Sequence, residues 1–241
     1  MDFLTLKAME EMEWLVHGFG MRPGGGEVVS RQDWRGKVIP DGERPLPLGS
    51  LRQVLGDEVV VCNPGLIPEL LWEEEGDGLI ADARGYAWGV FTADCLPIIL
   101  IDPARRVAGV VHAGWRGTAS GVLQRALEKM KVVFGCKGQE IIAAMGPCIR
   151  PCCLEVDEPV KKTFSEGSVP WGIASSPRGA GKWSLDLQAA NAWQLVQAGL
   201  KPENIHRLET CTCCKRELFY SYRADKTKGR QLSYIGLKSD G

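Results

Sequence analysis

The chain has 241 residues, of which 44% are hydrophobic, and its 29 basic and 30 acidic residues give a net charge of -1. A chain of this size buries a large core, and no repeat or long linker divides it, so we predict one domain, residues 1–241. Because no long run of either charge occurs, we expect binding to neither nucleic acid nor membrane. The acidic start is unlike a signal peptide, and no apolar stretch approaches the ~20 residues of a membrane span. We therefore expect a cytoplasmic protein whose cysteines are mostly reduced.

The hydrophobic pattern predicts mixed α and β structure. Short apolar runs predict strands at 14–19, 59–62, 78–81, 86–91, 97–101, 107–112, 139–145, 205–208 and 231–237. Apolar residues at helical spacing predict helices at 118–135, 157–164 and 187–198. Two stretches rich in turn-forming residues, 27–50 and 165–181, are expected to be an irregular loop and a surface insertion.

Two segments at strand ends carry the residues best suited to chemistry. Cys95 lies in the segment Thr92-Ala93-Asp94-Cys95-Leu96-Pro97, and His112 opens His112-Ala113-Gly114-Trp115-Arg116-Gly117-Thr118. If the flanking strands are neighbours, a thiol and an imidazole meet at one edge of a sheet, on turns that fix their positions. Either residue alone is more often part of a core, but the glycines, Asp94 and Arg116 argue against an apolar core here.

The turn after His112 also favours an anion. A helix that starts there leaves its first backbone N–H groups free beside His112, and Arg116 adds a positive charge. A phosphate or a carboxylate is therefore a credible ligand. The competing interpretation is that Arg116 pairs with an acidic neighbour at the surface.

Six of the nine cysteines fall in two clusters. One cluster is Cys148, Cys152 and Cys153, and the other is Cys211, Cys213 and Cys214. A second metal is the less favoured interpretation, because adjacent cysteines rarely both bind one ion. We expect reduced thiols in loops that line the same pocket as Cys95.

Further segments extend the two motifs into a pattern that covers residues 14–237. In chain order they are His17-Gly18-Phe19 with Arg22, the two motifs above, Gly146-Pro147-Cys148-Ile149, Leu154-Glu155-Val156, Cys211-Thr212, Phe219-Tyr220-Ser221-Tyr222-Arg223 and Gly229-Arg230. Together they resemble the YfiH-type family, which is variously labelled laccase-like polyphenol oxidase or multifunctional purine nucleoside phosphorylase. The oxidase label fits less well, because three histidines are too few for a multicopper cluster.

This resemblance implies an α+β fold of the YfiH (cysteine-hydrolase-like) type, a single compact domain of mixed sheets flanked by helices. It implies phosphorolysis of adenosine, inosine, guanosine or methylthioadenosine to base and ribose 1-phosphate, with adenosine deamination as a second activity. It implies a zinc ion held by a cysteine and two histidines, and Cys95 and His112 fall on two of these positions. We expect Cys95, His112 and Asp94 to be catalytic. We expect the substrate or phosphate to bind the arginines Arg22, Arg116 and Arg223.

One departure from the family pattern concerns the third zinc ligand. The family has Gln-Val-His-Gly where this chain has Gln53-Val54-Leu55-Gly56, and leucine cannot bind zinc. We therefore expect weak or absent zinc, unless His17 or Cys62 substitutes as the third ligand. A second departure is Ala224, where the family often has another arginine.

Two other functions stay open. One is a metal-independent hydrolase acting on a cell-wall (peptidoglycan) precursor, with Cys95 as nucleophile, His112 as base and Asp94 as the orienting group. The other is a binding protein that has lost catalysis, with Leu55 marking the loss. The sequence leaves the preferred nucleoside and the oligomeric state open.

Overall fold

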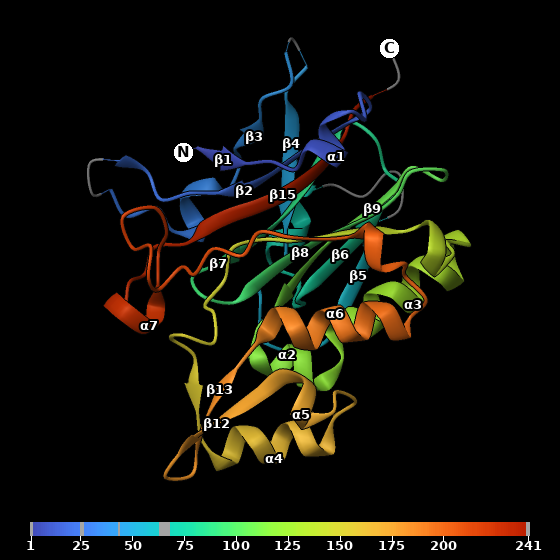
Figure 1. Ribbon diagram of the computed structural model, residues 1–241. Helices are drawn as coiled ribbons and strands as arrows, with labels where there is room; N and C mark the ends of the chain where they lie inside the picture. The colour runs from blue at the N-terminus through green and yellow to red at the C-terminus, as the bar shows by residue number, and fades with distance from the viewer. Residues whose placement is uncertain (1, 25–26, 43, 63–67, 240–241) are drawn as a thin grey trace.

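Two six-stranded sheets face each other in the computed structural model, which describes residues 2–24, 27–42, 44–62 and 68–239 (Figure 1). The first sheet has the order β1-β2-β15-β7-β4-β3. Its strands are β1 (Phe3–Leu4), β2 (Leu15–Gly20), β15 (Gln231–Leu237), β7 (Tyr86–Thr92), β4 (Leu46–Ser50) and β3 (Val38–Ile39). The C-terminal strand β15 therefore lies in the middle of this sheet, antiparallel to both β2 and β7.

The second sheet has the order β14-β10-β8-β9-β6-β5. Its strands are β14 (Ile205–Arg207), β10 (Ile142–Met145), β8 (Leu96–Asp102), β9 (Val107–Ala113), β6 (Gly78–Ala81) and β5 (Val59–Cys62). The four inner strands pair antiparallel, whereas β5 and β14 join the two edges in parallel. Every residue of β8 and β9 is buried, as expected for strands covered on both faces.

The side chains of β8 alternate between two hydrophobic cores. Ile98 and Leu100 pack toward the helices, and Ile99 and Ile101 pack toward the first sheet. A third cluster, which includes Trp72, Phe91 and residues of β3, β4 and β15, covers the opposite face of the first sheet. The central strands are thus held by packing on both sides, which fixes the positions of residues at their ends.

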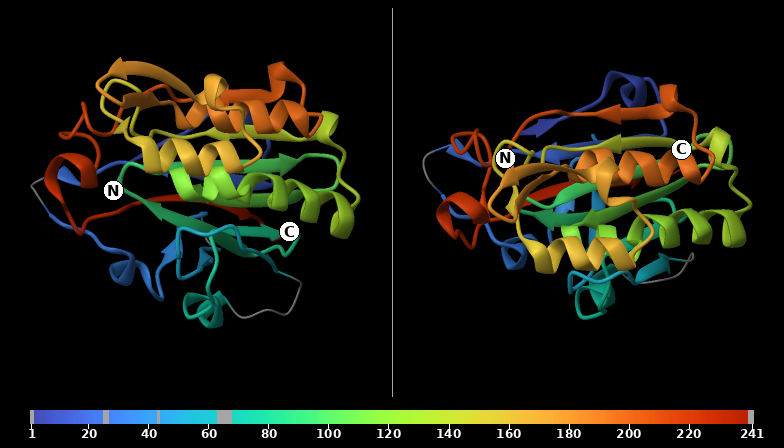
Figure 2. Two further views of the ribbon diagram at one scale, coloured as in Figure 1. Left: turned by 90° about the horizontal axis from the view of Figure 1, so that it is seen from below. Right: turned by 60° about the horizontal axis from the view of Figure 1, so that its bottom comes forward.

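The helices between residues 115 and 197 cover the outer face of the second sheet (Figures 1 and 2). They are α2 (Trp115–Ser120), α3 (Val122–Phe134), α4 (Glu158–Glu166), α5 (Trp171–Ala174) and α6 (Leu187–Gln197). A small sheet of β11 (Glu155–Val156), β13 (Lys182–Leu185) and β12 (Ser175–Gly179) lies beside them. The short elements that remain are α1 (Lys7–Glu10), α7 (Tyr222–Asp225) and the 3-10 helices η2 (Arg31–Trp34), η3 (Pro68–Trp72), η4 (Gly138–Glu140) and η5 (Pro202–Asn204).

This architecture confirms the predicted α+β fold of mixed sheets flanked by helices, and it corrects three local predictions. The helix expected at 118–135 is two helices, because Gly121 adopts a left-handed φ of 91° between α2 and α3. The segment expected to be an irregular loop, 27–50, contributes η2, β3 and β4. The expected surface insertion, 165–181, contains α5 and β12, which pairs with β13.

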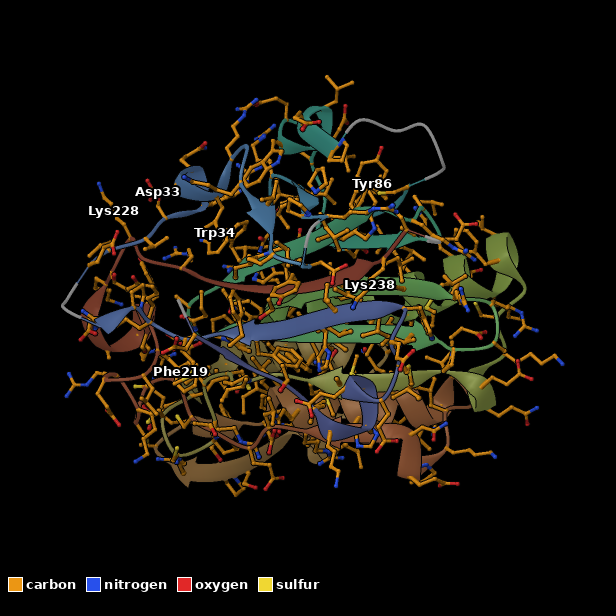
Figure 3. The ribbon with its side chains drawn as sticks, turned by 90° about the horizontal axis from the view of Figure 1, so that it is seen from above. Asp33, Trp34, Tyr86, Phe219, Lys228 and Lys238 are labelled. Atoms are coloured by element: carbon orange, nitrogen blue, oxygen red, sulfur yellow. The ribbon has the colours of Figure 1, made fainter. Side chains whose placement is uncertain are left out.

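Cys95 and α7 lie toward the same end of the molecule. Gln231 pairs with Thr92 at this end of β15, and Leu237 pairs with Tyr86 at the other end. Seen from above, Phe219 and Lys228 lie on the side that carries α7, and Tyr86 and Lys238 lie farther from α7 (Figure 3). No helix among the described residues is long and apolar enough to cross a membrane.

Candidate functional site

The pairing of β8 with β9 brings Cys95 and His112 together. Pro97 pairs with His112 and Leu96 pairs with Ala113, so Cys95 precedes the first residue of β8 where β9 ends. The shared edge predicted from the sequence is therefore present. Gly114 follows as the residue before α2, and a Cβ atom there would lie 3.1 Å from the Cys95 sulfur. A glycine at this position thus leaves room for the thiol.

A buried carboxylate, Asp77, holds the His112 ring. Asp77 Oδ1 lies 2.7 Å from His112 Nδ1, and the backbone N–H of His112 donates to the Asp77 carbonyl oxygen, also at 2.7 Å. The imidazole also shares a hydrogen bond with the Cys95 side chain. Cys95, His112 and Asp77 therefore form a continuous chain of thiol, imidazole and carboxylate.

The burial of His112 and its two neighbours, Cys95 and Asp77, determine its protonation state. Burial by itself lowers the pKa of His112, but electrostatic attraction to Cys95 and the hydrogen bond to Asp77 outweigh burial and raise the pKa to about 9. The ring is thus an imidazolium at neutral pH, stabilised on both sides by acidic groups.

Asp94 does not orient His112 and serves a different set of partners. Its two carboxylate oxygens accept hydrogen bonds from Thr212 Oγ1 at 2.8 Å and from the backbone N–H of Arg223 at 2.6 Å. The expected role of orienting group therefore belongs to Asp77, and Asp94 instead joins the segment before Cys95 to the turn at Thr212 and to α7. Asp94 has a left-handed φ of 92°, a conformation that Asp tolerates better than most residues.

The loop that carries Leu55 is fixed by the same carboxylate that holds His112. The backbone N–H groups of Val54, Leu55 and Gly56 donate to Asp77 at 3.2, 3.2 and 2.8 Å. Leu55 has a left-handed φ of 62°, and its side chain is 44% exposed in a pocket that Cys95 and His112 also line. The position at which the family has a histidine thus faces the site, as the resemblance implies.

Two pockets meet at Cys95. The larger one, about 560 Å³, is lined by Arg31, Arg52, Gln53, Leu55, Phe91, Ala93, Cys95, His112, Tyr222 and Arg230. The smaller one, about 310 Å³, is more apolar and is lined by Ala93, Asp94, Cys95, Trp115, Ile149, Leu154, Leu187, Tyr222, Arg223 and Lys226. Among the described residues, the larger pocket is lined by three arginines and by no carboxylate. Arg52 pairs with Glu75 outside this lining at 2.7 Å, whereas Arg31 and Arg230 donate to carbonyl oxygens, so their positive charge favours an anion.

The arginines expected to bind the anion are distributed differently. Arg116 is exposed and stacks on Trp115 at 4.3 Å, and Arg22 donates to the carbonyl oxygen of Arg216 at 3.3 Å. Neither is among the residues that line the two pockets. Arg223 does line the smaller pocket, but its guanidinium donates to the carbonyl oxygens of Cys153 and Glu155.

The donor set beside Cys95 does not match a zinc ion held by one cysteine and two histidines. Cys95 and His112 supply two donors, and Leu55 presents only carbon atoms. Neither proposed substitute reaches the pocket: His17 Nε2 accepts from the Leu6 backbone N–H at 2.9 Å, and Cys62 is buried in the core between the sheets. Burial raises the pKa of the Cys62 thiol to about 12, as expected for an inert core cysteine. Two donors hold zinc weakly.

The clustered cysteines line neither pocket, contrary to expectation. The structure instead brings four of them together. The sulfurs of Cys152, Cys153, Cys211 and Cys214 all lie within 4.8 Å of one another, and they form the one group of metal-ligating side chains found among the described residues. Cys211 and Cys214 have the C-x2-C spacing typical of metal sites, a signal that the sequence-based interpretation overlooked.

Sequence reasoning also missed Asp77, Arg31 and Arg52. Asp77 lies between Gly76 and Gly78, and no local pattern indicates that it becomes fully buried against His112. Arg31 and Arg52 belong to segments without a recognisable motif, and the topology alone brings them to Cys95. Arg230 was part of the family pattern, but its place beside His112 was not indicated.

Comparisons with known proteins identify the family of the chain. The family model described as multi-copper polyphenol oxidoreductase laccase matches residues 42–238. A purine nucleoside phosphorylase of Clostridium acetobutylicum is 36% identical over 190 residues, which cover 78% of this chain and 76% of that protein. An adenosine deaminase named RL5, from an unknown prokaryote, is 37% identical over 149 residues, 61% of this chain and 56% of that protein.

The third relative is similar to this chain both in sequence and in its crystal structure. The purine nucleoside phosphorylase YlmD of Geobacillus stearothermophilus is 37% identical over 170 residues, 68% of this chain and 61% of that protein. Its crystal structure superposes with a TM-score of 0.81 at 26% identity, covering 98% of this chain and 99% of that one. The chain therefore belongs to the YfiH-type family, whose model carries the description multi-copper polyphenol oxidoreductase laccase.

Proposed function

We propose that the chain is a purine nucleoside phosphorylase whose reaction takes place over Cys95 and His112. The observation that carries this proposal is that Cys95 and His112 line a pocket together with three arginines, while Asp77 holds the imidazole from behind. The names of the relatives, two phosphorylases and a deaminase, support the same class of substrate.

The two pockets suit the two halves of the reaction. Phosphate is a dianion or monoanion near neutral pH, and Arg31, Arg52 and Arg230 offer it positive charge in the larger pocket. The purine suits the smaller pocket, where Trp115 and Tyr222 provide aromatic surface. Cys95 lines both pockets, so the bond between ribose and purine lies above it in this arrangement.

Phosphorolysis then requires charge neutralisation and one proton. A phosphate oxygen forms the new bond to C1′ of the ribose while the bond between C1′ and the purine nitrogen breaks, and the departing base takes up a proton. The arginines neutralise the attacking anion. The imidazolium of His112, held by Asp77, keeps a proton available at this point of the pocket.

A product analysis tests the proposal. The full chain is incubated with adenosine, inosine, guanosine or methylthioadenosine, with and without phosphate, and the free base and sugar product are separated. We expect release of base and ribose 1-phosphate that depends on phosphate and is lost in Cys95→Ser and retained in the matched control Cys213→Ser. Release of free ribose without phosphate, or of inosine from adenosine as the main product, contradicts phosphorolysis.

A metal-independent hydrolase is the second candidate, and Asp77 is the observation that favours it. A thiol, an imidazole and a carboxylate in hydrogen-bonded sequence are the parts of a cysteine hydrolase, with Cys95 as nucleophile and His112 as base. In this case a cell-wall precursor is cleaved without phosphate, and alkylation of Cys95 stops the reaction. Binding of nucleosides without any turnover supports the third candidate, a binding protein that has lost catalysis.

A further inference from the structure

Two turns far apart in the sequence bring four thiols to one point. Residues 151–153 form a turn in which the Cys153 backbone N–H donates to the Arg150 carbonyl oxygen, and residues 212–214 form the second turn. The turns are joined where Cys148 and Cys211 pair as a single β-bridge and Thr212 N–H donates to the Cys148 carbonyl oxygen at 3.1 Å. Because residues 152 and 153 lie in a turn, both adjacent sulfurs reach the same neighbour.

The spacing of these sulfurs fits one tetrahedral ion. Cys214 Sγ lies 3.6 Å from Cys152 Sγ and 3.3 Å from Cys153 Sγ, and all four sulfurs lie within 4.8 Å of one another. A zinc ion bound to four thiolates at about 2.3 Å places them about 3.8 Å apart. An iron–sulfur cluster requires wider spacing, because its own iron and sulfide atoms separate the cysteines.

Backbone N–H groups and guanidinium groups surround the two turns that carry the four sulfurs. The Cys211 sulfur accepts hydrogen bonds from the backbone N–H groups of Arg150, at 3.4 Å, and of Cys214. Donors of this kind orient a metal-bound sulfur and spread its negative charge. Two guanidinium groups also contact the first turn: Arg178 donates to the Pro151 carbonyl oxygen at 2.6 Å, and Arg223 donates to that of Cys153 at 3.1 Å.

We propose that Cys152, Cys153, Cys211 and Cys214 bind one zinc ion as a structural four-thiolate site, separate from the Cys95–His112 pocket. Soft thiolate ligands in a tetrahedral arrangement select zinc among the common divalent cations. The ion connects the two turns and so holds Thr212, whose hydroxyl donates to Asp94 beside Cys95. Its role is thus to position the segment that carries Cys95, without contact with the substrate.

Metal analysis of the full chain tests this site. Protein is reduced, stripped with a chelator, incubated with Zn²⁺ or Co²⁺ and desalted. We expect one tightly held ion per chain in the wild type, in Cys95→Ala and in the matched control Cys213→Ser, and its loss in Cys214→Ser. Cys213 is the suitable control, since it lies in the same turn and its sulfur is outside the group of four.

Two further measurements need no variant and so stand even if Cys214→Ser does not fold. Co²⁺ bound to the wild type is expected to show the intense sulfur-to-metal absorption of four thiolates, and Zn²⁺ is expected to protect these four cysteines from alkylation while Cys213 reacts. The proposal is overturned by a reduced wild type that binds no ion, or by loss of the ion in Cys95→Ala. A Cys153–Cys214 disulfide in protein isolated under reducing conditions overturns it as well.

Discussion

Asp77 binds His112 twice, once through the side chains and once through the backbone. Asp77 Oδ1 lies 2.7 Å from His112 Nδ1, while the Asp77 carbonyl oxygen accepts the His112 N–H at 2.7 Å. The same carboxylate accepts the backbone N–H groups of the loop from Val54 to Gly56. One buried side chain therefore fixes both the imidazole and the loop that faces it.

Substitution of Asp77 is expected to affect both the His112 imidazole and the loop from Val54 to Gly56. Asp77→Asn removes the charge that stabilises the imidazolium, so we expect the pKa of His112 to fall and turnover to decrease by at least about tenfold. The loop contacts weaken as well, which costs about 1–3 kcal/mol of unfolding free energy, as expected for an impaired buried hydrogen-bond network. NMR titration of the His112 ring and urea unfolding measure the two effects.

Asp94→Asn is the matched comparison for this change. Its carboxylate binds Thr212 and Arg223, so the substitution is expected to leave the pKa of His112 close to that of the wild type. If Asp94→Asn lowers this pKa as much as Asp77→Asn does, the assignment of Asp77 as the orienting group is incorrect.

The raised pKa of His112 predicts a specific dependence of stability on pH. Since the folded-state pKa is about 9 and the unfolded value is about 6.5, protonation stabilises the fold fully below about 6.5, and this contribution is lost as the pH rises through about 9. The unfolding free energy of the wild type should therefore decrease across this interval. His112→Gln, measured in parallel, should lack this component, and identical pH profiles for the two proteins would refute the raised pKa.

Cys95 and His112 are expected to act as a pair. Cys95→Ala and His112→Ala should each abolish turnover while circular dichroism shows that the fold is retained, and His112→Ala should also lower the unfolding transition because it removes the buried partner of Asp77. The double variant should lose no more activity than either single variant, because residues that act as a unit are not additive. Near-normal turnover in both single variants would show that the reaction takes place elsewhere.

Phosphate is expected to stabilise the chain through the larger pocket. At ten times its dissociation constant, a ligand that binds only the folded state adds about 1.4 kcal/mol, which raises the Tm of a chain of this size by about 3–6 °C. Arg52→Gln and Arg230→Gln should reduce this shift relative to matched chloride, and Arg116→Gln should not. A shift lost only in Arg116→Gln would instead place the anion at the start of α2.

The parts of this fold that sequence reasoning found are those with strong local signals. The strands from β5 to β9 are fully or largely apolar, so their hydrophobic runs identify them within a residue or two. The break at Gly121 was missed, because the helical spacing of apolar residues continues through it. β12 was missed for the opposite reason, since its exposed Ser-Pro-Arg-Gly sequence gives no hydrophobic pattern and pairing with β13 decides its conformation.

The residues of the candidate site also differ in whether a local sequence signal identifies them. Cys95 and His112 stand in motifs, and the antiparallel pairing that joins them follows from two adjacent strands. Asp77 and Arg31 reach the site from segments that are distant in sequence, through the order of strands in two sheets, which no local pattern encodes. The four-cysteine group is an intermediate case, because its C-x2-C half is visible in the sequence and its second half depends on the turn at residues 151–153.

Leu55→His tests what the missing histidine means for the pocket. Leu55 lines the same pocket as Cys95 and His112, so a histidine there adds the third donor of the family's zinc site. We expect the wild-type pocket to hold substoichiometric zinc, and Leu55→His to raise its content toward one ion per chain and to increase phosphorolysis. The zinc content of Cys95→Ala, which keeps the four-cysteine group intact, is subtracted from both counts. If the wild-type pocket already holds one zinc ion per chain and Leu55→His changes this content little, a residue other than residue 55 supplies the third donor. Zinc uptake without a gain in phosphorolysis would separate the metal from the reaction, and would favour the hydrolase in which Cys95, His112 and Asp77 act alone.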